Sequence, residues 1–140
     1  MLKRWEDAGR LFNQFALETV PRDLRETLPF GRKYAQAGKR LPSKSPILAG
    51  LFSAMVPGTG KLYARQPGDA LFTVLVLATT GWQAYDGFHR DGMASTKGWV
   101  FGTLSGFFYL GNVYGSVVAA QVHNRRVEEE FLATIPTEIP

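Results

Sequence analysis

The stretch MVPGTGKLY, residues 55–63, resembles the end of a phosphate-binding loop, in which backbone N–H groups and a lysine hold a nucleotide. Such a loop requires Gly, four residues and then Gly-Lys-Ser/Thr, because the hydroxyl after the lysine ligates Mg²⁺. Counting from Gly60, Met55 stands where the first glycine is required and Leu62 stands where the hydroxyl is required. The helix that must follow the loop is interrupted at Pro67. We therefore expect no nucleotide site, and the glycines need another explanation.

Other residue types that carry chemistry are few. The chain has no cysteine, which excludes a disulfide, a thiolate zinc site and a thiol nucleophile. His89 and His123 have no partner at the spacing of metal ligands. Asp69 and Asp86 flank an apolar segment and would lie at its opposite ends, so they cannot form a catalytic pair. We expect no cofactor, no metal and no enzymatic activity.

Charge and length restrict the class of partner. The 140 residues suffice for one domain, and the net charge of +4 favours anionic partners, either nucleic acid or phospholipid headgroups. A dense Lys/Arg cluster interleaved with aromatic residues, as nucleic-acid binding requires, is missing. Phospholipid is therefore the favoured partner, and no nucleic acid is expected.

The chain changes character near residue 44, where a polar, basic region gives way to apolar segments. Three stretches carry no Asp, Glu, Lys or Arg: residues 45–60 (16 residues), 70–85 (16) and 98–122 (25). A membrane-spanning helix needs about 20 apolar residues, with a range of roughly 17–25. The third stretch reaches that length and the second is marginal. The first ends at Pro57-Gly58, which predicts a half-helix or re-entrant piece after an N-cap at Ser45.

Two patterns favour a membrane helical hairpin over a soluble all-α domain with buried helices. Residues 98–122 show no polar stripe of the kind that a surface helix needs. Trp82, Tyr85 and Trp99 lie near one short loop, where an aromatic belt would place them.

The basic residues predict the orientation of the hairpin. If the first stretch does not cross the membrane, Arg90 and Lys97 are the only basic residues between the second and third stretches. The positive-inside rule then places the opposite side, with the other basic residues, in the cytoplasm. If the first stretch does cross, this asymmetry is much weaker.

The third stretch is rich in glycine at spacings of four. Its glycines are Gly98, Gly102, Gly106, Gly111 and Gly115. Small residues at this spacing let another helix approach closely in lipid. The stripe predicts either oligomerisation or, the interpretation we favour, packing against the second apolar segment. Asn112 shares a helix face with Ser105 and Ser116, which predicts an interhelical hydrogen bond. A transport pathway is the alternative, but the stretch holds no ionisable residue inside it.

The N-terminal third is amphipathic. Apolar residues three or four apart predict a helix from about Leu2 to Glu18 and a second one over residues 32–38. The sequence WEDAGRLFNQFA resembles one helix of a tetratricopeptide repeat, which would make the chain the terminal, C-terminal part of a longer repeat protein. The alternative is an ordinary amphipathic helix on the domain or on the membrane surface. Residues 1–6 lack the apolar region of a secretory signal.

Residues 45–126 resemble the small bacterial membrane proteins of the two-transmembrane-helix (TM-two-like) type. In that family the first apolar segment ends in Pro-Gly-x-Gly-x-x-Tyr, followed by a short basic stretch and Gly-Asp before the next helix. The matching positions here are Pro57, Gly58, Gly60, Tyr63, Arg65, Gly68 and Asp69. The later run YLGNVYGSVVAAQVHNRR is similar as well, although Asn112 lies near where better-known members carry an acidic residue. The resemblance implies a topology and no established catalytic activity.

Together these patterns predict an all-α protein with a basic helical region at 1–44, a membrane domain at 45–126 and a polar tail at 127–140, whose start at Val127 continues the last helix. The expected function is a non-enzymatic, multi-pass protein of the bacterial cytoplasmic membrane, serving as an anchor or assembly subunit with a protein partner or further copies of itself. The alternatives are a transporter component and a soluble nucleic-acid-binding protein. The expected sites are an interface turn (Pro57, Gly58, Gly60, Tyr63, Gly68, Asp69), a helix-packing set (Gly102, Gly106, Gly111, Asn112, Gly115) and lipid-headgroup cations (Lys61, Arg65, Arg125, Arg126).

Overall fold

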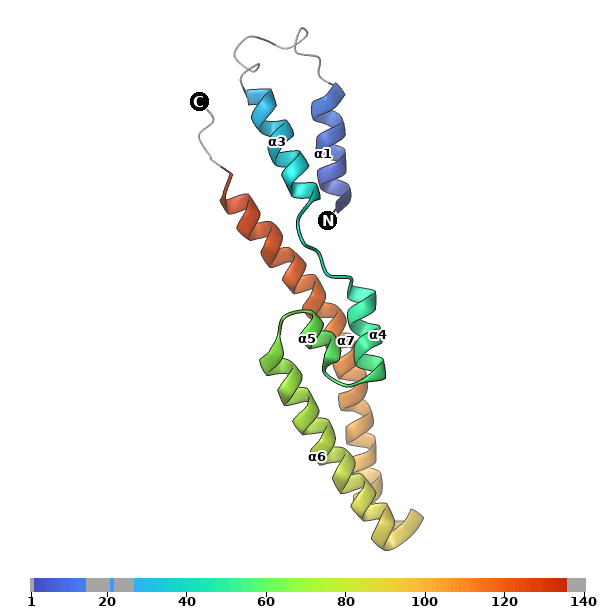
Figure 1. The fold of residues 1–140 in the computed structure, drawn as a ribbon. Coiled ribbons are helices and arrows are strands. Elements are labelled where there is room, and N and C mark those ends of the chain that lie inside the picture. The colour runs from blue at the N-terminus through green and yellow to red at the C-terminus, as the bar shows by residue number, and fades with distance from the viewer. Residues whose placement is uncertain (1, 15–20, 22–26, 136–140) are drawn as a thin grey trace. The chain divides into compact units, whose positions relative to one another are not determined.

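The computed structural model describes residues 2–14, 21 and 27–135, and these residues are almost entirely helical (Figure 1). The elements are α1 (Leu2–Gln14), α3 (Thr27–Lys39), α4 (Pro46–Met55), α5 (Thr59–Tyr63), α6 (Pro67–Asp91), the 3₁₀ turn η2 (Gly92–Ala94) and α7 (Thr96–Ala133). No strand occurs in the described part of the chain, which confirms the all-α prediction.

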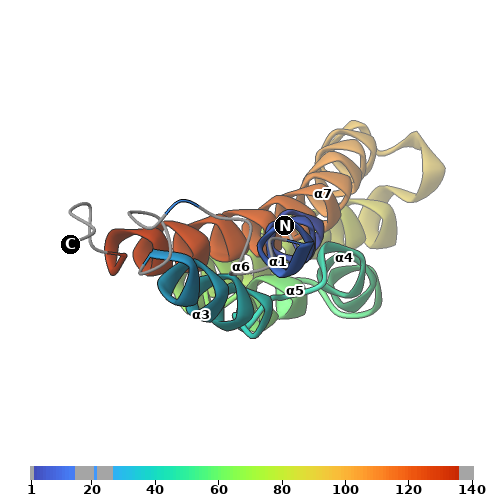
Figure 2. The same cartoon turned by 90° about the horizontal axis from the view of Figure 1, so that it is seen from above.

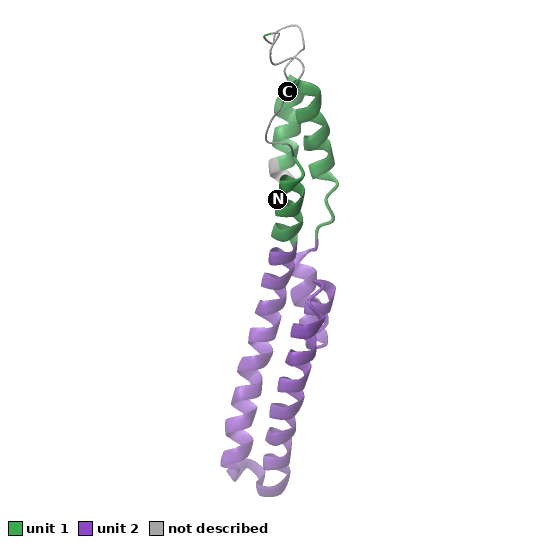
Figure 3. Ribbon diagram, turned by 90° about the vertical axis from the view of Figure 1, so that its left-hand side faces the viewer, with its two compact units in different colours: residues 1–43, 124–140 green, residues 44–123 purple. Residues whose placement is uncertain are grey.

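The chain divides into two compact units, which Figure 3 colours separately. Unit 1 contains residues 1–43 and 124–140, and unit 2 contains residues 44–123. Long α7 contributes to both units, because the boundary falls at His123. The helix expected from Leu2 is present as far as Gln14, and the rest of its expected length lies outside the described residues. Helix α3 is longer than the helix expected at 32–38.

Unit 1 packs α1, α3 and the last turns of α7 through aromatic rings. The ring of Trp5 meets that of Phe131 edge-on, with centroids 5.5 Å apart, and Tyr34 lies 6.3 Å from the same ring. Gly38 on α3 leaves room for Trp5, since a Cβ there would overlap the indole. Arg32 adds a hydrogen bond from Nε to the Phe12 carbonyl oxygen at 3.1 Å. The apolar face of α1 is therefore used within unit 1.

Unit 2 begins with the short helices α4 and α5, which lie beside each other (Figures 1 and 2). Ser45 is the N-cap of α4, as expected, and its side chain accepts a hydrogen bond from the Leu48 N–H. Thr59 closes the other end, because its hydroxyl lies 2.6 Å from the Phe52 carbonyl oxygen and 2.7 Å from that of Val56. Ten residues of α-helix rise about 15 Å, which is half the hydrocarbon thickness of a bilayer.

Two glycines determine the turn between α4 and α5. Gly58 has φ of +88°, a left-handed conformation that strains any other residue. Gly60 lies where α5 crosses α4, and a Cβ there would overlap the carbonyl oxygen of Ala49 and come within 2.6 Å of the Ser53 hydroxyl. The glycines that resemble a phosphate-binding loop therefore serve a sharp turn and a close helix contact.

Helices α6 and α7 form an antiparallel pair joined through η2 (Figures 1 and 3). They approach each other closely near the loop, where a Cβ on Gly87 would lie 2.5 Å from the Gly98 nitrogen. Residues 89–91 form the exposed last turn of α6, which ends where Gly92 adopts a φ of +60°. Helix α7 continues past Val127 as predicted. Among the described residues, none of the helices combines the length and apolar character required to cross a membrane.

The contact at Gly60 predicts a large and specific cost of substitution. Gly60→Ala is expected to destabilise unit 2 by about 1–3 kcal/mol or more, because the clash is with backbone that cannot rotate away. The measurement is the thermal unfolding of the chain, followed by far-ultraviolet circular dichroism.

Gly68→Ala is the matched control, since a Cβ at Gly68 would meet nothing within 4 Å. It is expected to stabilise the protein by about 0.4–1 kcal/mol through the unfolded state. Equal effects of the two substitutions would contradict the close contact between α4 and α5.

Candidate functional site

The interior of unit 2 contains only small or polar side chains, and every residue from 44 to 123 is described. Its buried apolar residues are all alanines: Ala49, Ala64, Ala70, Ala84, Ala119 and Ala120. Its buried polar residues are Ser53, Thr73, Thr80, Ser95, Asn112 and Ser116. The largest fully buried side chains are the serines Ser53 and Ser116. Leucine, isoleucine, valine and phenylalanine side chains are absent from the interior of this unit.

A chain of hydroxyl groups joins α4, α5 and α7. The Ser53 and Ser116 oxygens are 2.6 Å apart, and Ser53 Oγ accepts the Gly60 N–H at 2.9 Å. Ser116 donates its single hydroxyl proton to the Asn112 carbonyl oxygen at 2.8 Å. Ser53 must therefore be the donor to Ser116, because a serine has one hydroxyl proton. The resulting chain runs from the Gly60 amide through Ser53 and Ser116 to the Asn112 carbonyl, and such chains strengthen each bond in them.

Asn112 makes an interhelical hydrogen bond of the expected kind. Its side-chain Nδ2 donates to the Ser53 carbonyl oxygen at 3.4 Å, and the residue is only 4% exposed. Its Oδ1 is buried and has no hydrogen-bond partner among the described residues. One turn earlier on α7, the Tyr109 hydroxyl donates to the Ala54 carbonyl oxygen. Ser105, which was expected to share this face, is half-buried and outside the hydroxyl chain.

The interface-turn residues occupy different environments. Gly58 and Gly60 are buried in the turn between α4 and α5, whereas Gly68 and Asp69 are exposed at the start of α6. Tyr63 packs against the alanine cluster of Ala49, Ala64, Ala119 and Ala120. The Tyr63 hydroxyl accepts the Ser45 N–H at 3.1 Å, and the Lys44 ammonium lies 4.6 Å from its ring centroid. Tyr63 thus connects α5 to the beginning of α4.

The four cations expected at lipid headgroups also differ. Arg65, Arg125 and Arg126 are exposed, and the last two belong to unit 1. Lys61 is half-buried and points toward α6, where its ammonium donates to the Thr73 hydroxyl at 2.7 Å. Thr73 in turn donates to the Asp69 carbonyl oxygen at 2.8 Å. Within the described ranges no carboxylate pairs with Lys61.

The glycines of the helix-packing set do not act as one stripe. A Cβ on Gly102 would meet Phe88 and Ala84 of α6 at 3.6 and 3.9 Å, which is ordinary contact. A Cβ on Gly106 or Gly111 would meet nothing within 4 Å, so these two glycines face open space. A Cβ on Gly115 would instead lie 3.6 Å from Cε in the aliphatic stem of Lys61.

Large apolar side chains cover the outside of unit 2. The most exposed on α4 are Ile47 (74%) and Met55 (81%), and those on α6 and α7 include Phe72 (68%), Phe107 (70%) and Leu110 (65%). A soluble monomer rarely exposes a continuous apolar patch beyond about 300–600 Å². The outward faces of three helices are therefore apolar while their inward faces are small and polar.

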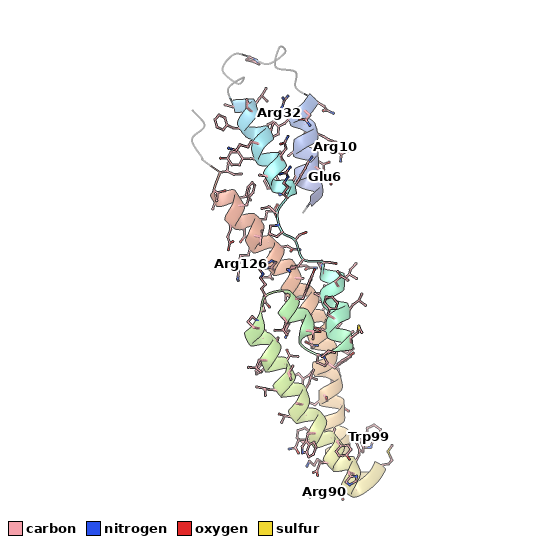
Figure 4. The ribbon with its side chains drawn as sticks, viewed as in Figure 1. Glu6, Arg10, Arg32, Arg90, Trp99 and Arg126 are labelled. Atoms are coloured by element: carbon pink, nitrogen blue, oxygen red, sulfur yellow. The ribbon has the colours of Figure 1, made fainter. Side chains whose placement is uncertain are left out.

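The loop end of unit 2 carries charges and aromatic rings, among them the labelled Arg90 and Trp99 (Figure 4). Asp86 accepts hydrogen bonds from Arg90 at 2.8 Å and from Lys97 at 2.7 Å. Chiefly through the bond from Lys97, these cations hold the pKa of Asp86 below its ordinary value of 3.8 and outweigh the effect of partial burial. The Tyr85 ring stacks on His89, and the Trp99 indole donates to the Met93 carbonyl oxygen.

The described residues contain no group of three or more His, Cys, Asp or Glu side chains placed to hold a metal ion. Comparison with known proteins adds no relative: no family model matches the chain, and neither a curated protein nor a solved structure is significantly similar. The resemblance to the two-helix membrane family therefore rests on the quoted residues alone.

Sequence reasoning missed Ser53, which lies at the centre of the hydroxyl chain. The available signal was its spacing of four from Ala49, because small residues at this spacing mark the inward face of a closely packed helix. The inward position of Lys61 had no signal in the sequence, since a lysine after a turn is ordinarily solvated.

Removing the central hydroxyl is expected to destabilise unit 2. Ser53→Ala leaves the buried Gly60 N–H without its acceptor and Ser116 without its donor, at a cost of about 1–3 kcal/mol. Thermal unfolding measures the loss. Ser105→Ala, at a half-buried serine outside the chain, serves as control and is expected to change stability by less than about 0.5 kcal/mol.

The loop carboxylate gives a pH-dependent prediction. Lys97→Met removes the main cause of the low Asp86 pKa, so the pKa is expected to rise toward 3.8. A folded pKa below the unfolded one contributes stability above pH 3.8 that is lost as the pH falls through the folded pKa. The measurement is a nuclear magnetic resonance titration of the Asp86 carboxyl carbon, and an unchanged pKa in the variant would contradict the pairing.

Proposed function

We propose that this chain is a membrane-embedded helical protein that serves as an anchor or assembly subunit and carries no catalysis of its own. The observation that carries the proposal is the reversed distribution of side chains in unit 2, with alanine, serine and asparagine inside and leucine, phenylalanine and valine outside. In water the hydrophobic effect drives large apolar side chains inward. In lipid that drive is absent, and close packing of small residues together with hydrogen bonds holds helices together.

The mean apolar character of α6 and α7 is lowered by residues that lipid would not meet. Thr73 and Thr80 of α6 and Asn112 and Ser116 of α7 are buried against the rest of unit 2. The threonine hydroxyls donate to carbonyl oxygens one turn earlier, Thr80 to Val76 at 2.8 Å, which satisfies them within the helix. Lipid would meet the outward side chains, and these are mostly apolar, although Thr79, Thr103 and Tyr114 are exposed as well.

The distribution of charge supports the same placement. Asp69 and Asp86 bracket an uncharged stretch of 16 residues, which as helix rises about 24 Å. The rings of Trp82 and Tyr85 lie in the last turn of this stretch, and the ion pairs of Asp86 and the ring of Trp99 lie beyond it. Aromatic and charged residues at the end of an apolar stretch are typical of a membrane–water interface. Unit 1 would then serve as the part that a partner protein recognises.

A charged substitution on the outer face of α6 tests whether that face contacts lipid or water. Leu75 is 57% exposed on α6, so Leu75→Lys is harmless if the face contacts water. In lipid it is expected to cost about 2.5–3.5 kcal/mol and to lower the membrane-inserted fraction. The measurement is the fraction of the full chain that remains in membranes after carbonate washing, for the original sequence and for the variant.

Leu11→Lys is the matched control, because Leu11 is equally exposed, at 57%, on α1 of unit 1. It is expected to leave the washed fraction unchanged. Single cysteines at Gly68 and Met93, both exposed, then report the hairpin, because the chain has no other thiol, and impermeant reagents are expected to reach them from opposite faces. Release of the original chain by carbonate would overturn the proposal and assign the apolar faces to a protein partner.

A further inference from the structure

A groove of about 160 Å³ lies between α6 and α7 in unit 2. Its walls are formed by Phe72, Val76 and Leu77 of α6 and by Phe107 and Phe108 of α7. Its polar residues are Lys61, Thr73 and Asn112, and Gly111 opens one side of it. The groove is thus mostly apolar with a small number of polar groups, as ligand sites in proteins commonly are.

Apart from Phe72, which directly precedes Thr73, the polar and apolar residues of the groove are separated along its length. Val76 and Leu77 follow Thr73 by one helical turn on α6, and Phe107 and Phe108 precede Asn112 by about one turn on α7. Because the two helices run antiparallel, both apolar pairs lie toward the same end. Lys61, Thr73 and Asn112 lie toward the other end, so the groove has a polar head and an apolar tail.

The head of the groove carries a positive charge that no carboxylate neutralises among the described residues. The Lys61 ammonium has three N–H donors, and the structure assigns one hydrogen bond to it, to Thr73. Partial burial of an ammonium is costly unless an anion or further acceptors compensate it. The head is therefore complementary to an anionic group.

We propose that this groove binds one anionic phospholipid, with the phosphate at Lys61 and part of an acyl chain between Val76, Leu77, Phe107 and Phe108. The inference rests on the proposed membrane location, and it adds a specific lipid site to it. The placement agrees with that location, because Thr73 is close to the Asp69 end of α6 and the apolar tail points toward the middle of the uncharged stretch. The groove has a volume of about 160 Å³, which suits one segment of an acyl chain rather than a whole lipid.

The test uses the full chain in detergent with an equimolar mixture of phosphatidylglycerol and phosphatidylcholine, and native mass spectrometry to count the retained lipid. The original sequence is expected to retain phosphatidylglycerol over phosphatidylcholine by about fivefold or more, the effect of one basic residue near an anionic lipid. Lys61→Gln is expected to bring this ratio close to one. Lys33→Gln, at an exposed lysine of unit 1, is the charge control and is expected to keep the ratio.

A second pair of variants tests the groove without changing any charge. Gly111→Leu is expected to fill the groove and to lower the amount of both retained lipids several-fold. Gly106→Leu is its control, because Gly106 lies on the same helix with equally open space and does not line the groove. Circular dichroism checks that each variant folds. If Lys61→Gln does not fold, the two leucine variants decide the question alone.

Retention of the lipid preference by Lys61→Gln, or equal loss in both members of either pair, would overturn the lipid site. This outcome is distinguishable from a failure of the proposed function. A carbonate-resistant chain without lipid preference keeps the membrane function and removes the site. A chain that carbonate releases removes the membrane function, and with it the lipid source on which the site depends.

Discussion

Close approach between α4, α5 and α7 is the constraint on which the rest of unit 2 depends. At Gly60 the backbone of α5 comes so near to the Ala49 carbonyl that a methyl group has no room. The same proximity brings the hydroxyls of Ser53 and Ser116 to 2.6 Å, so that a serine on each helix replaces the large side chains of an ordinary core. Dispersion contacts and hydrogen bonds between closely spaced backbones then hold the helices, rather than the burial of bulky apolar groups.

A core built in this way leaves no interior volume for the leucines and phenylalanines of the chain. They must lie on the outside, and that is where α4, α6 and α7 carry them. The apolar surface is therefore a direct consequence of the small interior, and both are explained if the surroundings of unit 2 are themselves apolar. The proposed membrane function follows from this pairing of a polar interior with an apolar exterior, and from neither feature taken alone.

The turn that carries the glycines also determines the position of Lys61. Because α5 lies against α4, its lysine extends toward α6 and reaches Thr73, and the stem of the lysine passes beside Gly115. A larger residue at 115 would occupy space next to that stem. The lysine that resembled part of a nucleotide loop is thus placed by helix packing at the head of an apolar groove. A lipid phosphate bound there would contact a lysine ammonium, as a nucleotide phosphate does in a phosphate-binding loop.

The sequence by itself determined the features that depend on neighbouring residues. The all-α class, the N-cap at Ser45 and the continuation of α7 past Val127 were all predictable, because capping and helical periodicity act over a few positions. The tertiary structure decided which residues are in contact. Ser53 bonds to Ser116, 63 positions away, and Lys61 bonds to Thr73. Gly106 and Gly111, by contrast, face open space. Spacing along one helix shows which residues share a face. It does not show which helix packs against that face, because that depends on how the other helices are arranged. For that reason the glycine stripe was visible in the sequence, and its division into packed and open positions was not.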